Sequence, residues 1–223
     1  MNSTKINSGN IKISEGLAEF YGAMIGDGCL SICNSRSRKK PIHIVLLTGH
    51  THDEPYYRNV IRPIFYKEFG INGYLCFRKP YNMTYFRTDS RRILYFMNQL
   101  GFPIGLKGNI KIPDLIMSDD RLSLACIRGV FDTDGSIYNR YSKKYKNHVK
   151  KYNYKNIEFK MNSQNIIEQT KIILERNGIR TSNIRKNRKA YVLNIHRQKS
   201  VRQFFDLVKP SNPYHKERFL NQG

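Results

Sequence analysis

One segment of the sequence occurs twice, and this repeat constrains the fold more than any other feature. The first copy is FYGAMIGDG at residues 20–28, and the second is IRGVFDTDG at residues 127–135. Each copy is apolar, has a central glycine (Gly22 or Gly129) and ends in an aspartate followed by glycine. These aspartates, Asp27 and Asp134, are 107 residues apart (134 − 27) in a chain of 223. A repeat at half the chain length predicts a duplicated domain.

Both copies have the spacing of a helix. Ser14 is expected to cap the first helix, over about 14–27, and Ser118 the second, because a serine oxygen accepts hydrogen bonds from free amides. Apolar residues then recur at intervals of three and four. Small residues on both helices permit close approach of two backbones. We therefore predict that the helices pack together and place Asp27 beside Asp134.

Two carboxylates at such helix ends are electrostatically unfavourable. Each faces the negative end of a helix dipole, at a cost of up to about 1 kcal/mol, and the two repel each other. Divalent cations would relieve both effects, and paired acids that hold metal near a phosphate predict metal-assisted phosphodiester hydrolysis. For one copy alone, a plain helix-to-strand turn is the simpler interpretation. The paired occurrence favours the catalytic one.

The charge balance indicates a polyanionic partner. Lys and Arg total 39 against 17 Asp and Glu, which gives a net charge of +22. Such an excess favours a polyanionic partner, and its spread over both halves indicates a folded basic surface. Nucleic acid is the predicted partner. An anionic membrane is the alternative, but the sequence shows no basic amphipathic helix.

The sequence also predicts where the protein resides. No apolar run approaches the roughly 18 residues of a membrane span, and the N-terminal segment lacks the apolar core of a signal peptide. The four cysteines form no C-x-x-C pair, so zinc ligation is not expected. We expect a soluble, intracellular, DNA-associated protein in a prokaryotic cytoplasm or an organelle.

The order of predicted elements is the same in both halves. A polar arm (1–12) precedes the first half (13–100), a linker rich in Gly and Pro (101–117) follows, and the second half spans 118–223. The first half continues with a hairpin at 29–49, a helix at 53–69, a hairpin at 74–88 and a helix near 90–100. The second half continues with a hairpin at 137–160, a helix at 164–177, a hairpin around 185–195 and a helix near 201–208. Pro63 is expected to kink its helix.

These elements predict an α+β fold with two pseudo-symmetric α-β-β-α-β-β-α halves. Each half is expected to form an antiparallel sheet with helices on one face, and the two motif helices are expected to join the halves. An antiparallel sheet can leave its other face open, and strands fit the major groove of DNA.

Basic residues at the hairpin turns are predicted to contact phosphates, and side chains on the open sheet faces to read bases. The predicted phosphate contacts are Arg36, Arg38, Lys39, Lys40, Arg78, Lys79, Lys143, Lys144, Arg185, Lys186, Arg188 and Lys189. The predicted base contacts, from strand alternation, are Arg87, Lys160 and Asn194. For the basic turn at 36–40, an ordinary solvated turn is the alternative interpretation.

The repeated segments resemble the paired motifs of the LAGLIDADG homing endonucleases in their single-chain form. The glycine, the acid and the final glycine are kept in both copies, whereas Phe-Tyr and Ile-Arg replace the first two letters. The resemblance covers about residues 14–220. It implies that Asp27 and Asp134 bind metal, that the backbone carbonyls of Gly26 and Thr133 are further ligands, and that two or three Mg²⁺ ions are used.

The resemblance also implies a basic residue near each acid. Lys107 lies 80 residues after Asp27, and Lys216 lies 82 residues after Asp134. Their implied role is to stabilise charge that develops at the scissile phosphate. In a chain with this many lysines, the matched positions can also arise by chance.

One position departs from the family pattern. Many relatives carry Gln or Lys near the end of the first hairpin of each half. This sequence has Gly49-His50 in the first half and Asn162 in the second. His50 and Asn162 are therefore the candidates for positioning water, and the departure weakens this part of the resemblance.

The leading hypothesis is a monomeric, Mg²⁺-dependent endonuclease, encoded by an intron, that cuts both strands of a long asymmetric DNA site. One alternative is an RNA-binding maturase that helps its intron to fold. Another is a DNA-binding regulator without cleavage, which both retained acids argue against.

Overall fold

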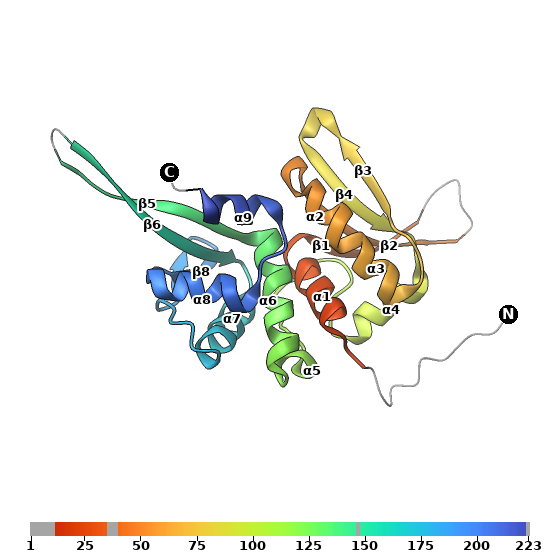
Figure 1. Cartoon of the computed structure of the whole chain (residues 1–223). Helices are drawn as coiled ribbons and strands as arrows, with labels where there is room; N and C mark the ends of the chain where they lie inside the picture. Colours follow the sequence, from red (N-terminus) through yellow and green to blue (C-terminus); the bar gives the residue numbers. More distant parts are fainter. Residues whose placement is uncertain (1–11, 35–39, 146–147, 222–223) are drawn as a thin grey trace.

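The computed structural model describes residues 12–34, 40–145 and 148–221, which form two similar halves (Figure 1). The first half contains α1 (Glu15–Asp27), β1 (Gly28–Cys33), β2 (Ile42–His50), η1 (Thr51–Asp53), α2 (Glu54–Tyr56), η2 (Tyr57–Ile61), α3 (Arg62–Phe69), β3 (Tyr74–Arg78), η3 (Lys79–Tyr81), β4 (Met83–Thr88) and α4 (Arg91–Gln99). The second contains α6 (Asp120–Asp134), β5 (Gly135–Tyr145), β6 (His148–Met161), α7 (Gln164–Arg176), β7 (Arg185–Asn187), β8 (Ala190–Ile195) and α8 (Gln198–Val208). Two further helices are α5 (Asp114–Met117) and α9 (Pro213–Leu220). The predicted α+β architecture is confirmed.

The two sheets have the same topology. Their strand orders are β1-β2-β4-β3 and β5-β6-β8-β7, and all neighbouring strands are antiparallel. Gly28, which follows the first acid, pairs with Leu47, and Gly135, which follows the second, pairs with Phe159. This shared register aligns the two halves where their strands follow the motif helices.

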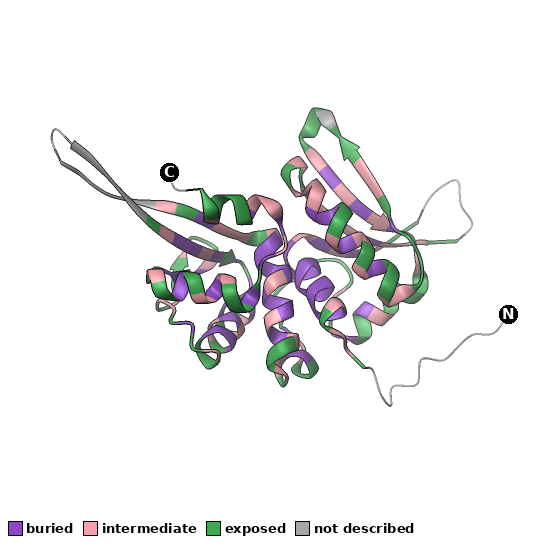
Figure 2. Cartoon of the chain, viewed as in Figure 1, coloured by how far each residue is buried: buried purple, intermediate pink, exposed green. Residues whose placement is uncertain are grey.

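The motif helices α1 and α6 lie side by side between the two sheets (Figure 1). A Cβ atom on Gly22 would lie 2.0 Å from the Cys126 carbonyl oxygen, and one on Gly129 would lie 2.0 Å from that of Glu19. Only glycine fits at such backbone contacts. Figure 2 shows that both helices are buried where they meet. The predicted packing of the two motif helices is therefore observed.

Each half contributes aromatic side chains to the core beneath its sheet. In the first half Phe65 packs on Phe86 of β4, with ring centroids 5.0 Å apart. In the second half Phe131 of α6 packs on Phe159 of β6 at 5.7 Å. Alternation along the strands turns the neighbouring residues to the other face of each sheet. That face carries Arg87, Lys160 and Asn194, the residues predicted to contact bases.

Three local predictions need correction or refinement. Asp119, rather than Ser118, caps α6, because its carboxylate accepts hydrogen bonds from two amides of the first turn. Pro63 lies at the start of α3, directly after the π-helical η2. A π-helical turn accommodates a proline whose ring would disrupt a regular helix. The predicted linker is also more structured than expected, since it contains α5 and the fully buried Phe102.

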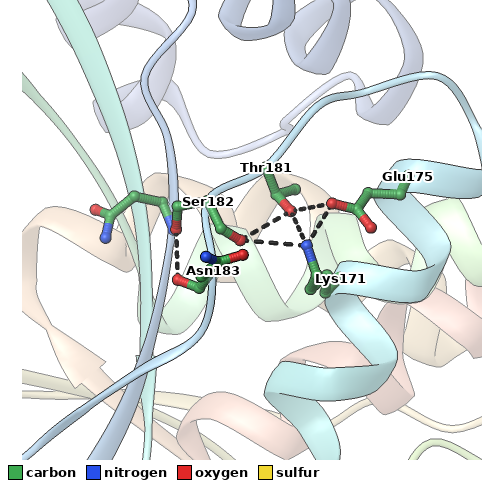
Figure 3. Close-up of polar contacts among 6 residues, drawn as sticks. Lys171, Glu175, Thr181, Ser182 and Asn183 are labelled. Carbon is green, nitrogen blue, oxygen red and sulfur yellow. Dashed lines mark hydrogen bonds and ion pairs between the residues drawn. The ribbon is translucent and has the colours of Figure 1, made fainter.

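The segment between α7 and β7 is held by a polar cluster (Figure 3). The Lys171 ammonium forms an ion pair with Glu175 and donates to the Thr181 hydroxyl at 3.1 Å and to the Ser182 carbonyl at 3.2 Å. The Ser182 amide in turn donates to the Asn194 carbonyl at 2.8 Å. These contacts fix the approach to β7, the edge strand that carries basic residues.

Candidate active site and nucleic-acid interface

The two predicted catalytic acids end the two motif helices. Asp27 is the last residue of α1, and Asp134 is the last residue of α6. A Cβ atom on Gly26 would lie 3.5 Å from the Cβ of Asp134, so the helix ends are in contact. Within the described residues, these carboxylates come from the two copies of the repeat, as the sequence predicted.

Burial makes this site unfavourable for negative charge. It raises the pKa of Asp27 to about 7; the Asp134 and Asp53 carboxylates add to this rise, while Tyr57 and Lys107 oppose it. Asp134 is more exposed, but partial loss of hydration raises its pKa as well, and the nearby charge of Lys107 opposes this rise. Carboxylates that resist ionisation in this way are electrostatically prepared for a cation.

Asp27 is held by groups that the sequence analysis did not identify. The Tyr57 hydroxyl donates to Asp27 Oδ2 at 2.7 Å. Asp53 lies beside this pair and accepts hydrogen bonds from the His50 amide at 3.0 Å and from the Asn212 side chain at 2.9 Å. In the sequence Tyr57 is one apolar position of a helix, and nothing local distinguishes it.

The two predicted lysines have different environments. Lys107 lies at the C-terminal end of α1, where its ammonium donates to the Ile25 carbonyl at 2.7 Å and also to the Gly26 carbonyl. Burial lowers the pKa of Lys107, while Asp134 and Asp27 oppose this change. Lys216 is exposed on α9, and its charge acts on Glu19 rather than on either motif acid. The structure therefore places only Lys107 with the acids.

A cavity of about 490 Å³ opens beside Asp134. Lys107, Lys160 and Asn162 line it together with Asp134. The water-positioning candidate of the second half, Asn162, thus shares a cavity with one acid and the half-buried Lys107. The volume suits a phosphate group and several water molecules, since one water occupies about 30 Å³.

The first-half candidate, His50, has a different role from the predicted one. Its imidazole caps η1 by accepting from the His52 amide at 3.2 Å, and its ring stacks on that of His52. His52 in turn stacks on Tyr214 of α9. The residue beside Asp27 is instead Gly49: a Cβ atom there would lie 2.9 Å from Asp27 Oδ2.

The oxygen ligands at the helix ends fit a divalent cation. Mg²⁺ is commonly bound by one or two carboxylates and keeps several waters, which matches Asp27 and Asp134 beside an open cavity. The Gly26 carbonyl, a predicted ligand, accepts from Lys107. The Thr133 hydroxyl bonds within α6, to the carbonyls of Gly129 and Val130. Within the described residues no cluster of three or more His, Cys, Asp or Glu side chains is arranged to hold a metal.

The first sheet presents part of its predicted DNA contacts. Lys40 and Arg78 are exposed. Arg87 points to the open face but forms a two-pronged ion pair with Asp89, at 2.7 and 3.0 Å. Three further predicted residues, Arg36, Arg38 and Lys39, lie outside the described residues, as does the side chain of Lys79.

Among the described side chains, the second sheet presents the larger basic group. Its exposed predicted residues are Lys160, Arg185, Lys186, Arg188 and Lys189. Asn194 lies on the predicted face, but it is only 4% exposed and its amide oxygen accepts from Asn156 at 3.1 Å. It is therefore not available to bases, because its neighbours cover it. The side chains of Lys143 and Lys144 lie outside the described part of the chain.

Comparison with known families places these features in context. Residues 121–209 match a family model described as a LAGLIDADG-like domain. The two-domain LAGLIDADG fold extends over both halves, as the similarity to solved structures shows. The resemblance predicted from the repeated segments is thus confirmed, and the matched region begins in the second motif helix, α6.

Solved LAGLIDADG structures share the fold over most of the chain. The homing endonuclease I-DmoI, solved with DNA and Mn, is 17% identical and aligns with a TM-score of 0.61 over 88% of this chain and 98% of that chain. The LAGLIDADG meganuclease I-AabMI, bound to uncleaved DNA, is 10% identical with a TM-score of 0.62 over 92% and 88%. The N-terminal LAGLIDADG domain of DUF199/WhiA is 12% identical with a TM-score of 0.54 over 92% and 89%.

No curated protein matches the sequence. Along the described residues, no helix is both long and apolar enough to cross a membrane.

Proposed function

We propose that the protein is a DNA endonuclease that hydrolyses both strands of a long asymmetric site with Mg²⁺. The observation that carries the proposal is the juxtaposition of Asp27, Asp134 and Lys107 at the ends of the packed motif helices. The fold supports it, since I-DmoI was solved with DNA and with Mn, Ca or Mg. We further propose that the enzyme acts as a monomer and is encoded by an intron.

The residues divide the work as follows. Asp27 and Asp134 would hold a divalent cation through their carboxylates. When bound there, the cation would supply Lewis-acid polarisation of a phosphoryl oxygen and a more acidic water. Lys107 places positive charge where the phosphate becomes more negative, which stabilises the transition state. The Asn162 side chain would form a hydrogen bond with a water in the cavity beside Asp134, as donor or as acceptor.

The charge distribution supports a duplex DNA partner. Exposed Lys and Arg side chains of both sheets would contact phosphates, which fixes register and makes affinity fall with salt. Two sheets on either side of the central helices provide two separate footprints (Figure 1). Because their side chains differ, each would read a different half-site, and the whole site would be asymmetric.

The test begins with selection of bound sequences from a random double-stranded DNA pool in Ca²⁺, using Asp27→Asn so that no DNA is cut. The selected duplex is then labelled on both strands and incubated with the wild-type protein in Mg²⁺. We expect breaks in both strands at one position, none with a chelator, and none with Asp27→Asn or Asp134→Asn. Asp206→Asn, at an exposed acid of α8, is the control and should cut normally.

Binding of one sequence without cleavage, in Mg²⁺ and in Mn²⁺, would contradict the endonuclease proposal and favour a DNA-binding regulator. If a parallel selection enriches one sequence from an RNA pool and none from the DNA pool, the result would favour a maturase. The DNA and RNA selections use the same protein preparation, immobilised on a support, so their outcomes can be compared directly.

A further inference from the structure

The two motif acids have different surroundings, and the difference centres on Gly49. A Cβ atom built on this glycine would lie 2.8 Å from Asp53 Oδ2, 2.8 Å from the Tyr57 hydroxyl and 2.9 Å from Asp27 Oδ2. Three polar side chains therefore converge on a position that has no side chain of its own. Any larger residue would displace the hydrogen bond between Tyr57 and Asp27.

The second half lacks this arrangement. Because Leu47 and Phe159 occupy the same register, Met161 is the counterpart of Gly49. Met161 is 8% exposed and lines the cavity beside Asp134 with an apolar side chain. Within the described residues, no hydrogen-bond donor reaches the Asp134 carboxylate, which faces the cavity. One acid is therefore held in place and the other can adjust.

Burial alone does not explain the contact between Tyr57 and Asp27. A buried hydroxyl generally requires a partner, so the contact could simply satisfy Tyr57. Its neighbour Tyr56 is equally buried, however, and its hydroxyl has no hydrogen-bond partner among the described residues. The fold thus tolerates an unpaired hydroxyl one residue away, while the Tyr57 hydroxyl is directed at the acid.

The support for Tyr57 extends into the other half of the chain. Asp53, beside Tyr57, accepts from Asn212 at 2.9 Å, and the same Asn212 amide donates to the Asp132 carbonyl in α6 at 2.9 Å. Asn212 is fully buried. This chain of contacts fixes η1 and η2 relative to α6, so the position of Tyr57 does not depend on a free loop.

We propose that Tyr57 is a positioning residue that fixes the orientation of the Asp27 carboxylate and makes the two acids functionally unequal. This inference rests on the proposed nuclease function. An acid held at a fixed angle presents the same oxygen in every turnover, whereas Asp134 must be ordered by what it binds. Loss of the Tyr57 hydroxyl therefore slows one strand cleavage much more than the other.

The experiment compares Tyr57→Phe with Tyr56→Phe. Both remove one buried hydroxyl from adjacent residues, but only Tyr57 touches Asp27. On a supercoiled plasmid that carries the selected site, Tyr57→Phe is expected to accumulate nicked circles, with the second cut slowed about tenfold or more relative to the first. Labelling must place every nick in the same strand, and Tyr56→Phe must behave as the wild type.

A second readout does not depend on cleavage. In calorimetric titration of the protein–DNA complex with Ca²⁺, Tyr57→Phe is expected to weaken one cation site about five- to tenfold. Tyr56→Phe should bind Ca²⁺ as the wild type does. Equal slowing of both strands, or unchanged Ca²⁺ affinity with an unchanged nick distribution, would overturn the proposal. If the wild type cuts no DNA, the endonuclease proposal fails, and the Ca²⁺ titration still decides whether Tyr57 orders Asp27.

Discussion

The two halves share one topology but end their motif helices differently. In the first half a lysine, Lys107, donates to the Ile25 and Gly26 carbonyls at the end of α1. In the second half the carbonyl of Asp132, the counterpart of Ile25, accepts from the neutral side chain of Asn212. The matched lysine, Lys216, is carried away from the acids on α9.

This difference shows how a duplicated fold can serve an asymmetric site. The packing of α1 on α6 requires both copies of the glycine, so the scaffold stays symmetric. The groups around the acids are not part of that packing and have diverged. The following predictions test the symmetric scaffold first and then the asymmetric features built on it.

The largest effect is expected from Gly22→Ala and Gly129→Ala. Each new Cβ would meet a backbone carbonyl oxygen at 2.0 Å, so the helices must separate, and we expect a loss of at least about 3 kcal/mol in the free energy of unfolding. Urea unfolding measures the loss. Gly16→Ala, also in α1, is the control, because its Cβ meets only side-chain atoms, at 3.0 and 3.4 Å. Similar losses at all three positions would contradict the close helix contact.

The next effect separates the two lysines. Lys107→Met removes a positive charge that acts on both acids, and we expect single-turnover cleavage of the selected DNA to fall about 100-fold or more. Lys216→Met should lower it less than about threefold, since its ammonium is exposed and away from both acids. DNA affinity measured in Ca²⁺ is the control for binding. Equal losses of cleavage for the two variants would contradict this difference and support the predicted arrangement with one lysine near each acid.

The third prediction concerns Asp27 without metal. Burial raises its pKa to about 7, above the ordinary 3.8, so the ionised form destabilises the fold. This cost is absent below about pH 4, grows as the pH rises and is complete above about pH 7. Asp27→Asn should therefore raise the free energy of unfolding by about 1–3 kcal/mol at pH 8 and by almost nothing at pH 4. Denaturant unfolding in a chelator measures this, with Asp206→Asn as the control; an equal gain at both pH values would contradict it.

The smallest effect distinguishes an exposed from a covered residue on the second sheet. Arg185→Ala should weaken DNA binding about three- to tenfold and reduce the salt dependence by about one ion. Asn194→Ala should leave the salt dependence unchanged and instead cost about 1 kcal/mol of stability, because the Asn156 amide loses one of its two acceptors. Binding at several salt concentrations tests both. A changed salt slope for Asn194→Ala would show that this residue reaches phosphate.

Several features could be predicted from the sequence because their signals are local. The spacing of apolar residues indicated the helices, and the Asp-Gly pairs marked where the motif helices end. Strand alternation placed Arg87 and Lys160 on the open faces, and the register confirms these placements. Alternation did not reveal that Asn194 is covered, because burial on an open face depends on the side chains of neighbouring strands.

The sequence by itself determined the duplicated fold, the two acids and the basic surface, since each follows from a pattern within one segment or from composition. Only the tertiary structure decided which groups surround each acid. Tyr57 is 30 residues from Asp27, and Asn212 is 159 residues from Asp53. Contacts over such separations arise where η2 packs beside the end of α1, and where Asn212, which precedes α9, reaches η1 and α6. The inequality of the two acids is therefore a property of the folded chain.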